Sequence, residues 1–154
     1  MTAQKGRMKE TIIDHITKDH EKVSEEIREL AKRVRGRRDT TLEPVFVPMR
    51  KELLGHMAAE EELLYPPLEK TMKKQVRDAI REHGAIRRYL DDLSSGGERS
   101  EAEWTRLLLL MKQEIEHHVE EEEGEILPAF RALHDEQTLL RLGDEFERLE
   151  EEHE

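Results

Sequence analysis

Four stretches of the chain carry apolar residues at the three- and four-residue spacing of an α-helix, and this periodicity constrains the fold most strongly. The stripes lie at about residues 13–34, 49–63, 76–93 and 104–126. Sparse β-branched residues and abundant Glu, Lys, Arg, Leu and Met favour helix over strand. The connections at 36–47 and 94–99 are long enough to return each helix beside its predecessor. We therefore predict an all-α fold, an antiparallel up-and-down four-helix bundle.

The length of 154 residues predicts a single domain over residues 1–154. We expect the bundle at about 10–133 and an additional C-terminal helix at about 135–152, marked by a fifth apolar stripe. That helix can cap the bundle, extend the surface of the fourth helix or form a dimer, and the sequence does not choose. The second helix is expected to begin near Pro48, and the fourth with a capping box of Ser100 and Glu103.

The formal charge of −11 argues against a nucleic acid or an anionic membrane as partner, because both would repel such a protein. The chain has no cysteine, which excludes disulfides, thiolate metal sites and iron–sulfur clusters. No segment has the apolar length of a signal peptide or a membrane span. We therefore expect a cytoplasmic protein with neither a nucleic-acid nor a membrane partner.

Polar residues interrupt all four apolar stripes at their centres. Two stripes carry a histidine followed four residues later by a glutamate, a spacing that aims both side chains at one place. The pattern is duplicated, because His-x3-Glu-x5-Pro occurs twice, and the remaining two histidines each follow an acidic residue. Buried carboxylates without cations would be costly, and no Lys or Arg lies on these stripes. The candidate metal ligands are His20, His56, Glu60, His83, His118 and Glu122.

Imidazole and carboxylate together suit iron, manganese, zinc or cobalt, whereas calcium and magnesium prefer oxygen alone. Six ligands are too many for one tetrahedral zinc ion. They fit a pair of ions, each held by two histidines and both bridged by Glu60 and Glu122.

The order H, HxxxE, H, HxxxE resembles that of the hemerythrin-like family, the HHE cation-binding domain, over about residues 10–133. The resemblance implies a four-helix bundle that holds two iron ions, joined by an oxide or hydroxide bridge, and that takes a small diatomic ligand or peroxide. In one respect the chain departs from the oxygen-carrying hemerythrins, because Arg87 stands where they have a second histidine on the third helix. This departure implies open positions on both irons, which suits peroxide or nitric oxide as well as O2.

Two functions of different classes follow. One is a di-iron protein that binds or reacts with O2, hydrogen peroxide or nitric oxide, with catalase-like chemistry conceivable; since Glu60 and Glu122 are taken up as bridges, no catalytic residue is assigned and enzymatic activity stays open. The alternative is an iron-storage or sensor protein that acts through a partner without turnover. A third hypothesis is a bundle without metal, in which the six polar residues satisfy one another.

Residues close to the six leave further alternatives open. His15 lies one residue off the first stripe, and His117 with Glu121 has the same spacing as His118 with Glu122, although helical phase and the repeat favour the latter pair. Tyr65 is expected either to pack at a helix end or to hydrogen-bond near the metals. A solvated face is expected for the remaining glutamates, Glu61, Glu62, Glu120, Glu121 and Glu123.

Overall fold

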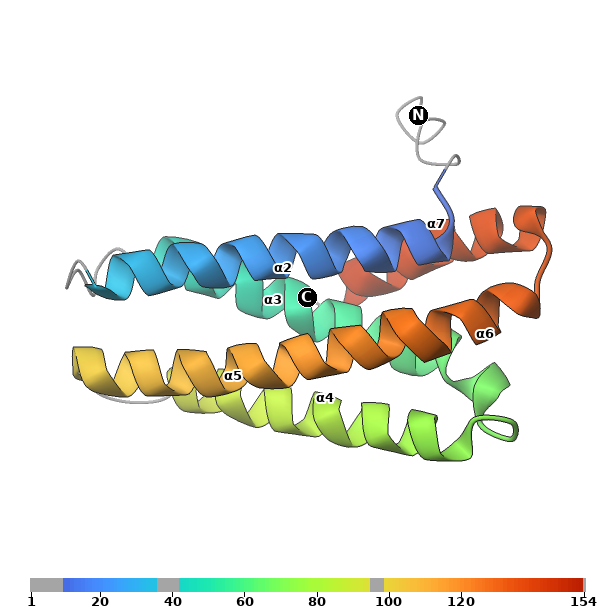
Figure 1. The fold of residues 1–154 in the computed structure, drawn as a ribbon. Helices are drawn as coiled ribbons and strands as arrows, with labels where there is room; N and C mark the ends of the chain where they lie inside the picture. The colour runs from blue at the N-terminus through green and yellow to red at the C-terminus, as the bar shows by residue number, and fades with distance from the viewer. Residues whose placement is uncertain (1–9, 36–41, 95–98, 154) are drawn as a thin grey trace, which may run out of the picture.

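The structure is a computed structural model that describes residues 10–35, 42–94 and 99–153. All the regular secondary structure in these ranges is helical, which confirms the all-α prediction. The long helices α2 (Ile12–Arg35), α3 (Glu43–Ala59), α4 (Lys73–Ser94) and α5 (Glu101–Glu121) lie lengthwise beside one another in a bundle (Figure 1). None of the described helices is long and apolar enough to cross a membrane.

Short segments of other helical types continue two of the long helices. The π-helix η2 (Glu60–Leu64) extends α3 and is followed by the 3₁₀-helix η3 (Pro66–Leu68). The π-helix η4 (Glu122–Ile126) extends α5 and leads into α6 (Leu127–Ala132). The last helix is α7 (Glu136–Glu152).

The helix α3 begins at Glu43 rather than near Pro48, so this expectation is wrong. Pro44 occupies its first turn, where no helical N–H bond is lost, and Pro48 lies inside the helix. Burial of Phe46 and Met49 offsets the single hydrogen bond that Pro48 cannot donate. The connection expected at 36–47 is therefore shorter, and residues 36–41 lie outside the described part, as do 95–98 of the next connection.

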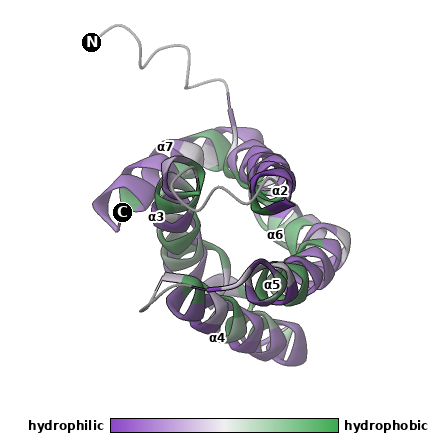
Figure 2. Ribbon diagram, turned by 90° about the vertical axis from the view of Figure 1, so that its left-hand side faces the viewer, coloured by the Kyte–Doolittle hydropathy of each residue, from purple (hydrophilic) through white to green (hydrophobic). Residues whose placement is uncertain are grey.

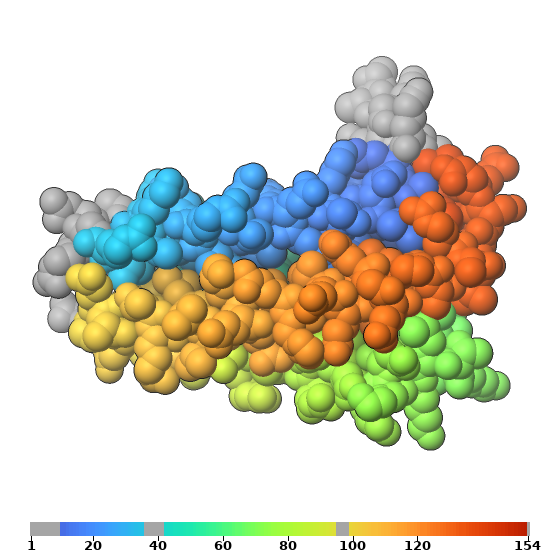
Figure 3. Space-filling view, in the orientation of Figure 1, coloured from blue at the N-terminus to red at the C-terminus, as the bar shows by residue number. Residues whose placement is uncertain are grey.

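At the start of α5 the capping box is confirmed. The Ser100 hydroxyl accepts the Glu103 N–H at 3.1 Å, and the Glu103 carboxylate accepts the Ser100 N–H at 3.2 Å. Along the bundle, apolar residues face inward and charged residues outward (Figure 2). On the face in Figure 3, α2 and α5 pack against each other along their length.

The helix α7 covers α2 and α3 rather than extending the surface of α5, and a dimer through this helix stays a prediction. It buries Leu139, Gly143 and Phe146. A Cβ at Gly143 would lie 2.5 Å from the backbone oxygen of Glu10, so only glycine allows this approach.

The buried apolar side chains form two clusters, one toward each end of the bundle. Along each long helix the change from one cluster to the other falls at the polar residues of its stripe. The core therefore consists of two apolar parts with a polar layer between them.

Candidate metal centre

Glu60 and Glu122 each begin a π-helical turn, which places both carboxylates in the polar layer. Six residues after each comes a proline, Pro66 or Pro128, which has no N–H and would clash with the carbonyl four residues earlier. The wider turn relieves this clash: the Tyr65 N–H donates to the Glu60 carbonyl at 3.1 Å, five residues back. The extra residue in the turn also shifts the helical phase, so that Leu64 is buried where the stripe predicted Leu63.

The structure brings the six candidate ligands together in two groups that share both glutamates. In each group the candidate ligand atoms lie within 4.8 Å of one another. We call His20, His56, Glu60 and Glu122 the first half, and Glu60, His83, His118 and Glu122 the second half. Each of the six is at most 7% exposed, so a charge at this centre is shielded from water.

Four buried atoms of the first half point at one another as two His–Glu pairs at ion-pair distance, without the geometry of a hydrogen bond. His20 Nε2 lies 3.1 Å from Glu122 Oε1, and His56 Nε2 lies 2.9 Å from Glu60 Oε2. These atoms are among the few buried side-chain nitrogens and oxygens in the described residues that have no hydrogen-bond partner. Two imidazole nitrogens and two carboxylate oxygens converging in this way fit a divalent or trivalent cation.

The second half contains a further residue, Tyr65. Its hydroxyl lies 2.5 Å from Glu122 Oε2, 3.2 Å from Glu60 Oε1 and 3.2 Å from His83 Nε2, and its side chain is 1% exposed. His83 Nε2 also lies 3.2 Å from His118 Nε2. The Tyr65 hydroxyl is therefore placed to act as an additional metal ligand or as a hydrogen-bond donor to a ligand.

The two halves consequently differ in their surroundings, because the Tyr65 hydroxyl lies beside the second half; open positions on both ions stay a prediction. At the position in the second π segment that corresponds to Tyr65 the chain has Leu127, which cannot hydrogen-bond. A comparison of the two repeats could have indicated a role for Tyr65. Five residues after the glutamate, the first repeat has this tyrosine, whereas the second has an apolar leucine.

Each of the four histidines has a carboxylate at its outer nitrogen, Nδ1. This arrangement turns Nε2 of each ring toward the centre and fixes the ring's orientation. The pairs, at 2.7 to 2.8 Å, are His20 with Glu123, His56 with Asp19, His83 with Glu61, and His118 with Glu82.

Two of these carboxylates were expected on a solvated face, and the other two were not predicted to have any role at the site. Glu61 and Glu123 follow the two central glutamates and do not belong to a purely solvated face. Asp19 and Glu82 are the acids that precede His20 and His83, a part of the repeat for which no role was predicted. Helical geometry explains their function, since neighbours in a helix point about 100° apart, so each acid faces the next helix.

Arg87, four residues after His83, does not enter the centre. Its guanidinium donates two hydrogen bonds to Glu61, at 3.0 and 3.1 Å. Glu61 in turn holds His83 Nδ1 at 2.7 Å. Arg87 therefore acts on the centre indirectly, because it holds the carboxylate that orients His83.

Neither His15 nor His117 joins the two halves. His15 Nε2 lies 3.7 Å from Glu10, toward the start of α2. His117 is 57% exposed, and its Nε2 lies 3.3 Å from Glu82 and 3.4 Å from Glu121. The helical phase that favours His118 agrees with this placement.

Electrostatics at the centre favour positive charge. Burial alone would lower the pKa of His56, but the charge of Glu60 and hydrogen bonds with Asp19 and Glu150 hold it well above its usual value. Burial would likewise lower the pKa of His118, but the charge of Glu122 raises it, and this pKa is also well above its usual value. Burial would raise the pKa of Glu60, yet His56 holds it well below its usual range. Because these histidine pKa values are raised, protons compete with a metal cation for the same side chains.

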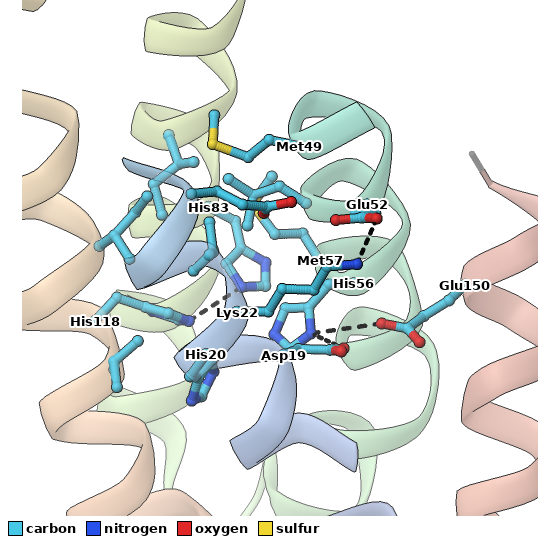
Figure 4. Close-up of a pocket in the computed structure, with 16 residues that line it drawn as sticks. Asp19, His20, Lys22, Met49, Glu52, His56, Met57, His83, His118 and Glu150 are labelled. Carbon is cyan, nitrogen blue, oxygen red and sulfur yellow. Dashed lines mark hydrogen bonds and ion pairs between the residues drawn. The ribbon is translucent and has the colours of Figure 1, made fainter. Parts of the chain in front are cut away.

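A cavity of about 180 Å³ opens onto the centre beside α2 and α3. All four histidines contribute to its wall, and Figure 4 shows their rings converging from the four long helices. Apolar side chains, among them Met49, Leu53 and Met57, form another part of the wall. Lys22, in contact with Glu52 at 2.7 Å, lies at the exposed side.

Fold and site together define a helical-bundle protein with a buried centre of imidazoles and carboxylates suited to a cation. The model of one family, the hemerythrin HHE cation binding domain, matches residues 11–130, and the chain belongs to this family. Comparisons with curated proteins and with solved structures gave no match.

Proposed function

We propose that this single-domain chain is a non-haem di-iron protein that binds or reacts with O2, hydrogen peroxide or nitric oxide. Its four long helices form the antiparallel up-and-down bundle, with α7 as an additional helix. One iron ion would be held in the first half and one in the second, with Glu60 and Glu122 shared between them. A pair of iron ions supplies a two-electron redox couple when bound.

One observation carries this proposal: two imidazole nitrogens and two carboxylate oxygens of the first half converge in the core, with 3.1 and 2.9 Å between the atoms of each His–Glu pair. Two buried carboxylates are costly to keep without cations, and one metal ion could contact all four atoms at once. The carboxylate on every outer histidine nitrogen supports the same conclusion, since metal-binding histidines are commonly oriented in this way.

The cavity narrows the class of ligand. A volume of about 180 Å³ readily admits a diatomic molecule or peroxide, because a water needs only about 10–15 Å³ of such space. Apolar side chains, among them Met49, Leu53 and Met57, line it beside the four histidines, which favours a ligand without net charge. Small neutral ligands fit this environment best.

The first test is anaerobic titration of apoprotein with iron(II), followed by exposure to air. We expect two irons per chain and a near-ultraviolet charge-transfer band. One iron or none would contradict the di-iron assignment. The loaded protein is then mixed with peroxide, O2 or nitric oxide, and an unchanged spectrum with all three would refute the proposed reactivity.

Matched variants distinguish this function from its alternatives. Glu60→Leu and Glu122→Leu should abolish iron binding, whereas in a metal-free bundle they should only stabilise the fold. His15→Ala and His117→Ala are the controls and should retain both irons, because neither side chain reaches the centre. Two bound irons without peroxide turnover would favour iron storage or sensing over catalysis.

A further inference from the structure

The helix α7 reaches the metal centre, although it follows the part of the chain that the family model matches, residues 11–130. Phe146, which is fully buried, places its ring edge-on to the His56 ring, with centroids 5.7 Å apart and planes at 80°. One turn further on, Glu150 Oε2 lies 3.7 Å from His56 Nδ1. Figure 4 shows Glu150 approaching His56 from α7, on the side away from the other histidines.

Glu150 also lies close to the residue that orients His56. Asp19 Oδ2 lies 2.8 Å from His56 Nδ1, and one side-chain atom each of Asp19, His56 and Glu150 lie within 4.8 Å of one another. The link therefore runs from α7 through α2 to α3. Its position is fixed by the close approach of Gly143 to the backbone at Glu10 and Thr11.

The corresponding histidine of the second half has a different environment. His118 Nδ1 lies 2.8 Å from Glu82, the counterpart of Asp19. The second oxygen of Glu82 lies 3.3 Å from His117, a neighbour of His118 on the same helix that is 57% exposed. Glu150, in contrast, is 15% exposed and comes from a separate helix, so it restrains Asp19 more firmly.

We propose that α7 is a positioning element for the first half of the centre: Glu150, through Asp19, fixes the orientation of His56 and thereby sets the metal affinity of that half. The two metal positions then differ in affinity, although their six ligands are related by the internal repeat. This inference rests on the two-ion function proposed above. Loss of a residue that orients a metal-binding histidine typically weakens metal binding about 10–100-fold.

The experiment titrates apoprotein with cobalt(II), whose visible absorption reports the geometry of each bound ion, in the complete chain. Glu150→Ala is the test variant, and Glu151→Ala, an exposed glutamate one residue further on, is the matched control. Glu150→Gln is the conservative variant, because its amide can still hydrogen-bond to Asp19. Asp19→Asn tests the same link from α2. Far-ultraviolet circular dichroism checks that each variant is folded.

For Glu150→Ala we expect the affinity for one of the two ions to fall about 10–100-fold, with the other within about two-fold of the parent protein. Glu150→Gln should recover most of this loss, and Glu151→Ala should show none. Unchanged binding in Glu150→Ala would overturn the proposal, and so would equal weakening of both ions, which indicates general loosening of the bundle. Should Glu150→Ala fail to fold, the same outcomes for Asp19→Asn decide.

The two proposals fail in different ways. If the parent chain binds fewer than two cobalt ions, the di-iron assignment fails. If it binds two, and Glu150→Ala binds both as the parent does, the assignment stands and the role of α7 is refuted. A nitrogen-15 NMR spectrum of the apoprotein histidines gives a readout without metal, since only the His56 signals should shift in Glu150→Ala.

Discussion

Gly143→Ala tests the close contact that seats α7 on α2. An added Cβ would lie 2.5 Å from the Glu10 oxygen, 3.0 Å from the Thr11 carbonyl carbon and 3.1 Å from the Ile12 nitrogen, whereas ordinary contacts begin at 3.4 Å. All three atoms are backbone, so the helices must separate by about 1 Å, and such overpacking costs about 1–3 kcal/mol. Alanine in a helix interior regains up to about 1 kcal/mol over glycine.

Gly84→Ala is the matched control, because it makes the same change inside α4 with only a side-chain atom of Arg88 nearby, at 3.8 Å. It should gain the helical preference alone and raise the melting temperature by about 2–4 °C for a chain of this size. Gly143→Ala should melt up to about 8 °C below the parent protein.

Urea denaturation and calorimetry of the two apoprotein variants measure this difference directly. A melting temperature for Gly143→Ala equal to that of Gly84→Ala would refute the reasoning, since it would mean that α7 does not approach the backbone at Glu10. The separation should also move Phe146 away from His56, so the NMR signals of that histidine give an independent check.

Three further predictions concern residues around the site and at a helix start. Burial and then repulsion by Glu52 raise the pKa of Glu26 to about 7, so the folded state gains protons relative to the unfolded one and loses stability as pH rises from about 4.5 through 7. Glu26→Gln should therefore stabilise the protein by roughly 1 kcal/mol more at pH 8 than at pH 5 in urea denaturation, a figure reduced for partial exposure, and an equal effect at both pH values would contradict this pKa. Tyr65→Phe removes the hydroxyl that donates to Glu122 at 2.5 Å and should lower apoprotein stability by about 1–3 kcal/mol, measured in the same way; a neutral result would mean that the carboxylate finds another donor. Ser100→Ala removes the cap of α5 and should lower the melting temperature by about 2–4 °C, unless the end of that helix is already frayed.

The repeat of histidines and glutamates was sufficient to predict which side chains meet, because helical phase determines the face of each long helix. His118 could be chosen over the adjacent His117 on this ground alone. The apolar periodicity likewise identified the four long helices and the C-terminal one. These features depend on residues a few positions apart, which a sequence displays directly.

Features that depend on contacts between distant segments could not be predicted in this way. The π turns at Glu60 and Glu122 shift the phase by one residue, so a uniform helical period misplaces Leu63. Glu61 and Glu123 looked like solvent-facing charges because nothing local shows that a histidine of another helix lies opposite. The contact of Glu150 with His56 joins residues 94 positions apart in the chain, and only tertiary packing brings them together.

The polar layer between the two apolar clusters has a consequence for how the molecule unfolds. Each cluster is held by its own side chains, and without a cation the layer joins them mainly through charges and hydrogen bonds. The two ends of the bundle can then open as separate cooperative units in the apoprotein. A pair of ions that together bind residues from all four long helices would connect these units, so that metal loading would convert a stepwise melting into a single concerted transition.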